Sequence, residues 1–269
     1  MEQMLRRSVQ ECLMLRLAES KFGPYFYLAD ESLGADRTLT YLYLANERIL
    51  PSEGFVPGQV FSREFVKKFA DYLAVLMTPE VTIQTAAEEN VIDLDAEVER
   101  MHIPLTLVIR DAGETELFPA ERLLTPKFYD GKPGTILICS PEDELADHIL
   151  EILRKMELLN DMSQYARACR ILSREAVDGT RFSVRLRSLC ESANIALRPE
   201  RLSKIISYRT YPYMKKKWHN FKKRHSEMSF SWEEVIDLLS LFLSPVWEKL
   251  CKGEVFFGDW MPQLHRFLD

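Results

Sequence analysis

The sequence lacks most of the short motifs that disclose an enzymatic chemistry. It contains no glycine-rich phosphate loop, no GxSxG elbow, no HExxH and no CxxC. Their absence removes the usual sequence signals for P-loop nucleotide binding, α/β-hydrolase chemistry and zinc proteolysis. The five histidines share no metal-ligand spacing, so a metal held by histidines is not expected. The five cysteines are odd in number and widely spaced, and we expect them to be buried, reduced thiols.

Membrane and export signals are also missing. No run of 18 apolar residues occurs, and the first 15 residues mix charges into their apolar positions, so neither a membrane span nor a signal peptide is expected. A cytoplasmic location follows as the default. The formal net charge of −6 argues against a protein that coats nucleic acid along its whole surface. With 269 residues and 46% hydrophobic residues, the chain can bury one large core or two smaller ones.

The first half of the chain, residues 1–139, shows both helical and strand patterns and is predicted to form an α/β domain. In the strand over 38–44, Leu39, Tyr41 and Tyr43 face one way, and apolar residues also occur on the other face. A loop rich in proline and glycine is expected over 119–134. The expected elements are helices over 3–20, 63–77 and 91–101, and strands over 25–28, 38–44, 81–85, 103–110, 115–118 and 135–139.

From residue 140 to residue 269 the pattern predicts helices only, as a separate helical domain. Ser140 is a good N-cap, Pro141 suits the first helical position, and acidic residues follow in the first turn. Asn160 is expected to cap the next helix. A capping box at Ser231 predicts a helix over 232–243, and Pro245 is expected to restart a further short helix.

The pair Asp93 and Asp95 forms a D-x-D motif whose meaning depends on the local structure. On a strand, both carboxylates would share one face and could hold Mg²⁺. The spacing of Val91, Leu94 and Val98 instead favours a helix, on which the two carboxylates would point about 200° apart. A solvated helix face is therefore the preferred interpretation.

A basic segment, Lys215–Arg224, stands out in this acidic chain. It contains five lysines and one arginine together with Trp218 and Phe221, and no Asp or Glu occurs between Arg201 and Ser226. Such a patch is typical of a surface for RNA or for an acidic protein partner. A solvated lysine-rich face, with both aromatic residues in the core, explains the pattern equally well.

From Ile103 to Leu250 the chain resembles the nucleotidyltransferase toxins of abortive-infection (AbiE-type, AbiEii) toxin–antitoxin systems. The resemblance rests on the strand IPLTLVIR, on the strand and helix ICSPEDELADHILEI, on Asn160-Asp161-Met-Ser-Gln164, on Trp218–Phe221 and on FLSPVW at 242–247. The order and spacing of these pieces carry the similarity, because each is weak alone. The resemblance implies a bacterial protein whose nucleotide site would include Asp161 and Asp147.

The chain departs from the family at several functional positions. His148 stands where the family has a lysine, and Gln164 stands where it has a second acid. The family's two Mg²⁺-binding carboxylates correspond to Tyr41 and Tyr43, and its glycine turn is missing. A neutral phenol cannot replace a carboxylate as a Mg²⁺ ligand. A third carboxylate, expected on the strand 103–110, is also absent.

We therefore predict an α+β fold: a nucleotidyltransferase-like mixed sheet with flanking helices over 1–139, followed by an all-helical domain over 140–269, with a cleft between them. The predicted function is that of a nucleotidyltransferase-like protein with a degenerate site, a pseudoenzyme. If it were active, Mg²⁺ and an NTP would be its cofactors. The alternative is a non-catalytic protein that binds RNA or an antitoxin-like partner through the cleft or the basic segment, with neither membrane nor DNA involved. An unrelated two-part α/β protein is the third possibility.

Overall fold

A seven-stranded mixed sheet organises the first of two units in the computed structural model of this protein. The N-terminal unit comprises Met1–Glu114 and Pro119–Cys139, and the C-terminal unit comprises Thr115–Phe118 and Ser140–Asp269. The predicted mixed α+β class is confirmed. The structure describes residues 1–29, 37–45, 55–78, 81–98, 100–112, 117, 119–160, 162–225 and 228–268.

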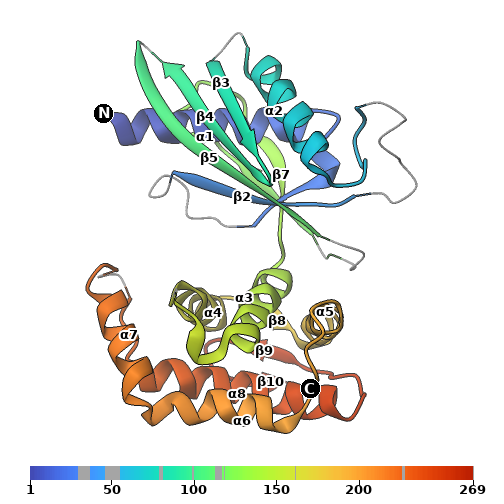
Figure 1. The fold of residues 1–269 in the computed structure, drawn as a ribbon, viewed down its shortest axis with the longest axis vertical. Coiled ribbons are helices and arrows are strands. Elements are labelled where there is room, and N and C mark those ends of the chain that lie inside the picture. Colours follow the sequence, from blue (N-terminus) through green and yellow to red (C-terminus); the bar gives the residue numbers. More distant parts are fainter. Residues whose placement is uncertain are drawn as a thin grey trace. The chain divides into compact units, whose positions relative to one another are not determined.

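The strands of the N-terminal unit lie in the order β3-β4-β5-β2-β1-β7-β6 (Figure 1). The neighbours β1 and β7 are parallel, as are β2 and β5, and the other neighbouring strands are antiparallel. The strands are β1 (Phe26–Leu28), β2 (Thr38–Tyr43), β3 (Thr82–Glu88), β4 (Val91–Val98), β5 (Met101–Asp111), β6 (Ala120–Leu124) and β7 (Gly134–Ile138).

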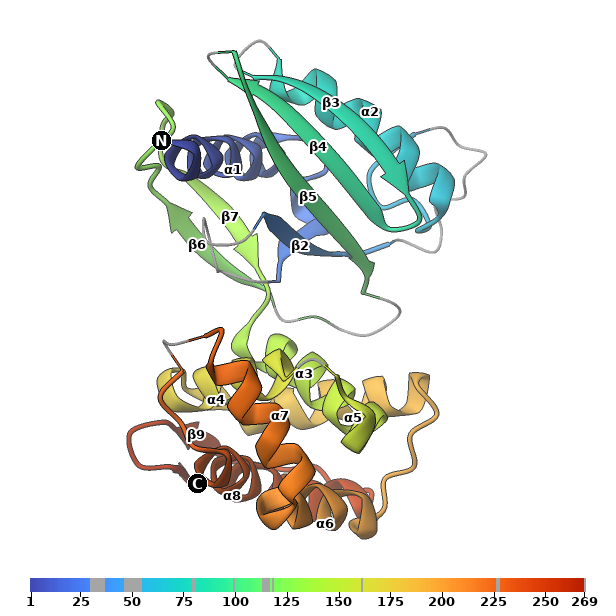
Figure 2. The same ribbon diagram turned by 60° about the vertical axis from the view of Figure 1, so that its left-hand side comes forward.

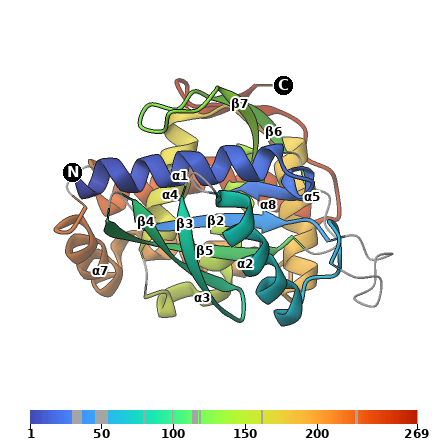
Figure 3. The ribbon, with the colours of Figure 1, turned by 90° about the horizontal axis from the view of Figure 1, so that it is seen from above.

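Two helices, α1 (Glu2–Glu19) and α2 (Arg63–Met77), pack on one face of this sheet (Figure 2). The hydroxyl oxygen of Ser62 accepts a hydrogen bond from the Phe65 N–H at 3.1 Å, so Ser62 is the N-cap of α2, which begins where the helix 63–77 is predicted. Seen from above, β6 and β7 lie beside α1 on the side away from α2 (Figure 3). The edge strand β6 is therefore not covered by a second helix.

The C-terminal unit is mainly helical, and its longest helix, α8, contacts α4, α5, α6 and α7. Among the described residues, no helix is both long and apolar enough to span a membrane. The helices are α3 (Pro141–Lys155), α4 (Ser163–Arg174), α5 (Gly179–Ser192), α6 (Pro199–Ser207), α7 (Pro212–Lys222) and α8 (Trp232–Cys251). Short 3₁₀ helices occur at η1 (Gly23–Tyr25), η3 (Met156–Leu158) and η4 (Tyr208–Thr210).

The helix predicted over 91–101 is wrong, because this stretch forms β4 and the start of β5. Ile92, Leu94 and Ala96 are buried in alternation, which is the period of a strand. The strand pairs on both sides, with β3 and with β5, and these backbone hydrogen bonds override the helical spacing of Val91 and Val98. Asp93 and Asp95 consequently share the face of the sheet opposite α1 and α2.

Other elements were missed for identifiable reasons. The strand β6 falls in the stretch that is predicted to be a loop. Its central residues are exposed and show no hydrophobic alternation, so the sequence carries no strand signal there. The C-terminal unit also contains a three-stranded sheet, β10-β9-β8, whose strands are too short for a periodic signal. The prediction of helices alone omitted these strands: β8 (Val177–Asp178), β9 (Asp259–Met261) and β10 (Arg266–Leu268). The strand predicted over 115–118 lies mostly outside the described residues.

Two helix boundaries also differ from the prediction. The N-cap of α4 is Met162, not Asn160. The helix α8 continues through Pro245 without a break. Proline removes the hydrogen bond to the carbonyl of Leu241, and that residue lies at the exposed surface, where water can replace the lost donor.

Candidate functional site

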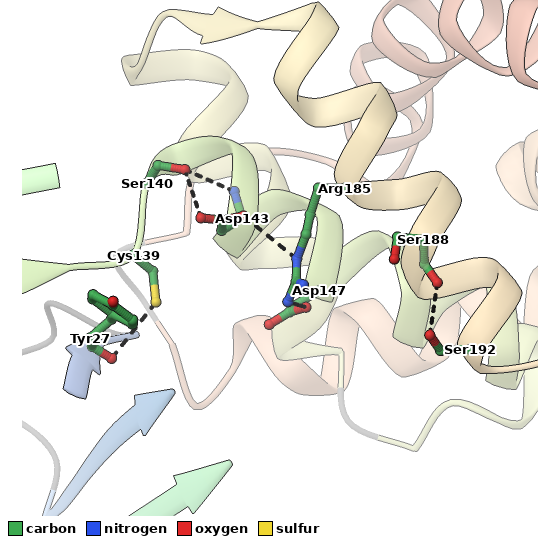
Figure 4. A network of polar contacts seen from close by, with 8 residues as sticks. All are labelled: Tyr27, Cys139, Ser140, Asp143, Asp147, Arg185, Ser188 and Ser192. Carbon is green, nitrogen blue, oxygen red and sulfur yellow. Dashed lines mark hydrogen bonds and ion pairs between the residues drawn. The ribbon is translucent and has the colours of Figure 1, made fainter. Parts of the chain in front are cut away.

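The polar residues of α3 form a buried network with α5 in the C-terminal unit (Figure 4). Arg185 of α5 is only 2% exposed, and its Nε lies 3.5 Å from Oδ1 of Asp143, which is 1% exposed. Its Nη2 donates to Oδ1 of Asp147 at 3.4 Å. The Ser140 hydroxyl donates to the Asp143 carboxylate at 3.2 Å and accepts from the Asp143 N–H at 3.1 Å. The N-cap of α3 and the buried arginine thus hold the same aspartate.

A second polar group lies on α3 around His148. Nδ1 of His148 lies 2.7 Å from Oε1 of Gln164 on α4, and Nε2 lies 3.3 Å from Oε1 of Glu144. Arg170 approaches the same Glu144 oxygen at 4.0 Å. The imidazole is almost fully enclosed, with its side chain 8% exposed. These contacts fix the ring between two helices and leave it little access to a substrate.

Of the two residues predicted for the nucleotide site, one can be placed. Asp147 lies on α3, where it is paired with Arg185 and its side chain remains 23% exposed. Asp161 lies outside the described residues. Asp147 is therefore a partly accessible carboxylate that shares a buried guanidinium with Asp143, an arrangement that favours a structural role.

His148 and Gln164, the two departures from the family pattern on these helices, contact each other directly. The contact joins α3 to α4 and is made by an imidazole and a neutral amide.

Tyr41 and Tyr43, the positions that the sequence resemblance predicted to correspond to metal-binding carboxylates, lie in the core of the N-terminal unit. They are 4% and 0% exposed on the helix-covered face of the sheet. The Tyr43 ring stacks on Phe65 with centroids 4.5 Å apart, and its hydroxyl donates to the Gln59 carbonyl at 2.8 Å. Burial raises the pKa of both phenols above the ordinary value, so they stay neutral. Neither side chain can coordinate Mg²⁺.

The D-x-D pair on β4 provides the nearest arrangement to a strand-borne metal site. Oδ1 of Asp93 accepts from the Thr106 hydroxyl at 2.9 Å, and Oδ2 of Asp95 lies 2.9 Å from Nδ1 of His102. Across the described ranges, no group of three or more His, Cys, Asp or Glu residues is placed to hold a metal ion. Each carboxylate of the pair thus has a contact on the neighbouring strand β5.

The basic segment Lys215–Arg224 is largely the helix α7, with Trp218 and Phe221 buried in the core. Half of its cations have protein acceptors. Lys217 donates to the carbonyls of Glu157 and Leu159 at 3.0 and 2.8 Å. Lys222 donates to two carbonyls before α8, and Lys215 pairs with Glu233. The segment thus connects α7 to neighbouring turns, and its solvent-facing cations are Lys216, Lys223 and Arg224.

Replacing Lys217 with methionine is expected to lower the free energy of unfolding by about 1–2 kcal/mol, because the backbone carbonyls of Glu157 and Leu159 lose a charged donor. Lys216, one residue away, is exposed, and the same replacement there is expected to change stability by less than about 0.5 kcal/mol. Urea unfolding followed by tryptophan fluorescence measures both values. Equal effects at the two positions would contradict the assignment of Lys217 as a link between α7 and the turn 157–159.

The cysteines agree with the expectation of reduced thiols. All five are free, and Cys251 alone is partly accessible. Burial raises the pKa of Cys12, of Cys169 and, to about 12, of Cys190, which makes these thiols poor nucleophiles.

Sequence reasoning missed Arg185, the centre of the buried network. Its signal was present: a charged residue stands on the apolar face of α5, between Phe182 and Leu186. A buried arginine requires a buried acid, but the sequence alone does not say which of the acids on α3 provides it.

Comparisons with known proteins assign no family to this chain. No protein-family model matches the sequence, and no curated protein matches it. A crystal structure of an antigenic nucleotidyltransferase-like protein from Paracoccidioides brasiliensis is similar over 85% of this chain and 92% of that chain, with a TM-score of 0.39 and 7% sequence identity. A similarity at this level fixes neither fold family nor activity.

Proposed function

We propose that this chain is a nucleotidyltransferase-like protein related to AbiE-type toxins that has lost Mg²⁺-dependent nucleotidyl transfer. One observation carries the proposal: the two positions that match the family's metal carboxylates are phenols buried in an apolar core. Metal-dependent phosphoryl chemistry needs carboxylates on an accessible face beside the phosphates. Tyr41 and Tyr43 supply neither the charge nor the access.

The helices α3 and α4 support the same proposal independently. A lysine at position 148 would offer a mobile charge to a nucleotide phosphate. His148 is instead enclosed between Gln164 and Glu144. Asp147 is held by Arg185, which it shares with the buried Asp143. The residues of this region stabilise the helices and leave no cation exposed at the family's lysine position.

Calorimetric titration of the full chain with Mg²⁺ and each of the four NTPs tests the proposal. After subtraction of the heat of Mg²⁺ binding to the NTP alone, we expect no heat that depends on the metal, because the two positions matched to metal carboxylates are buried phenols. Near-UV circular dichroism before and after the titration checks that the protein is folded. Metal-dependent binding with a millimolar or lower dissociation constant would contradict the proposal. In that case the variant Asp93→Asn/Asp95→Asn identifies whether the strand-borne pair is responsible.

A binding role for α7 is the second candidate function, favoured by the exposed cations Lys216, Lys223 and Arg224. Lys216 lies on α7, and Lys223 and Arg224 follow directly after its last residue. The other lysines of the segment are already engaged, which limits a polyanion surface to these three side chains. Three phosphate contacts give weak and strongly salt-dependent RNA binding.

Charge reversal in the variant Lys216→Glu/Lys223→Glu is expected to weaken binding of single-stranded RNA and to reduce the slope of log K against log salt by about 1 to 2. Filter binding at several salt concentrations measures this slope. Lys132→Glu, which reverses an exposed charge in the N-terminal unit, serves as the control. Equal affinities of the double variant and the unaltered protein would show that α7 is only a solvated face.

A further inference from the structure

A cavity of about 380 Å³ lies in the N-terminal unit between α1 and the strands β6 and β7. Leu28, Ile136 and Ile138 form its apolar floor. The segment 125–128, which follows β6, closes one side. The cavity lies where α1 packs along β7, with the edge strand β6 farther from the helix (Figure 3). Its volume falls within the range of sites that bind small molecules.

One carboxylate fixes the wall of this cavity. Oε2 of Glu11, on α1, accepts hydrogen bonds from the backbone N–H groups of Lys127, Phe128 and Tyr129, at 3.0, 2.8 and 3.0 Å. Three donors on one oxygen attach the loop to the helix. Glu11 is the only acidic residue among the described residues that line the cavity, and it is engaged with this wall.

The remaining charged residues around the cavity are cations. Arg7, Arg122 and Lys127 line it, which leaves a formal excess of two positive charges over Glu11. The Arg7 guanidinium lies over the Phe128 ring, with Cζ 5.5 Å from the centroid. Its Nε is buried and has no hydrogen-bond acceptor within the part of the chain that the structure describes. A buried donor without an acceptor costs free energy, which an anionic ligand could recover.

We propose that this cavity binds a small amphiphilic anion, with its charged group at Arg7 and Lys127 and its apolar body on Leu28, Ile136 and Ile138. The class comprises carboxylates, sulfonates and phosphate monoesters on an alkyl or aromatic body. The site shares no residue with Tyr41, Tyr43, Asp147 or His148, so it does not depend on the proposed loss of nucleotidyl transfer. The apolar floor excludes highly polar anions, and the cations exclude amines.

Titration of the full chain with decanoate below its micellar concentration tests the site. Decanol, which has the same alkyl chain and no charge, is the control ligand. We expect one decanoate to bind and decanol to bind at least about tenfold more weakly, since only the carboxylate carries a negative charge toward the cations. No binding of decanoate, or equal binding of decanol, overturns the proposal.

Two variants locate the binding. Lys127→Met is expected to weaken decanoate about fivefold to tenfold and to leave decanol unchanged, because only the charge is removed. The Glu11 contact uses the backbone N–H of Lys127, so this side chain can be replaced without disturbing the wall. Arg7→Met should have the same effect, provided that its thermal melting is unchanged. Lys132→Met, an exposed residue outside the lining, is the matched control. Weakening by Lys132→Met as large as that by Lys127→Met would indicate non-specific attraction and overturn the site.

Discussion

Replacing Tyr41 and Tyr43 with aspartate is expected to unfold the N-terminal unit and not to restore a metal site. Both side chains lie in the core, where the Tyr43 ring stacks on Phe65 and the Tyr41 ring contacts Phe26 edge-on. Each aspartate would leave a cavity and place a carboxylate in an apolar site, at a combined cost of more than about 5 kcal/mol. This cost is comparable to the whole stability of a typical domain.

The two units allow this effect to be observed selectively. All four tryptophans, Trp218, Trp232, Trp247 and Trp260, lie in the C-terminal unit. In Tyr41→Asp/Tyr43→Asp, the backbone amides of β1, β2 and β5 should therefore lose their protection from hydrogen exchange while the tryptophan fluorescence keeps its native spectrum. Tyr43→Phe is the control: it loses only the hydrogen bond to Gln59 and should cost about 1 kcal/mol. A folded double aspartate variant that binds Mg²⁺ would mean that these positions are accessible, contrary to the structure.

Replacing Arg185 with methionine is expected to destabilise the C-terminal unit by about 3–5 kcal/mol. Asp143 is 1% exposed, and without the guanidinium it would be a buried carboxylate deprived of its cation. The loss is larger than that of an ordinary salt bridge, because it leaves an uncompensated charge. Urea unfolding followed by tryptophan fluorescence measures it, since the tryptophans report on this unit.

Two further variants separate the effect of losing the Arg185 charge from the effect of losing its side-chain packing. Arg181, on the same helix, pairs with Asp178 at the surface, and Arg181→Met should cost less than about 1 kcal/mol. In Asp143→Asn/Arg185→Met the stranded charge is removed, so part of the lost stability should return, with a coupling free energy of about 1–3 kcal/mol. Strict additivity of the two single variants would contradict a direct ion pair between Arg185 and Asp143.

Much of the local structure could be predicted from the sequence, because local signals act within a few residues. Ser62, Ser140 and Ser231 cap the helices that begin after them, and each hydroxyl accepts an N–H within its own first turn. The apolar stripe of α1 and the strands β2 and β5 follow from simple periodicity. The apolar stripe of α3 is likewise buried where this helix packs against α4 and α5. The mixed α+β class follows from these elements together.

The candidate site could be predicted only in part, because its residues are joined by contacts distant in sequence. Asp147 could be identified by resemblance, but its partner Arg185 lies 38 residues away on α5. The contact between His148 and Gln164 depends on how α3 packs against α4. The anion cavity depends on Glu11, whose three donors lie more than 100 residues further along the chain.

The sequence by itself determined where the helices begin, which residues are apolar on each helix and that the cysteines are reduced thiols, since these depend on neighbouring residues and composition. Only the tertiary structure decided whether residues 91–101 form a helix or strands. The helical spacing of Val91 and Val98 favours a helix, but backbone hydrogen bonding of β4 to β3 and β5 outweighs it. The tertiary structure also decided that Tyr41 and Tyr43 belong to the core. The face of a strand that is covered depends on where α1 and α2 pack, and no local pattern specifies this.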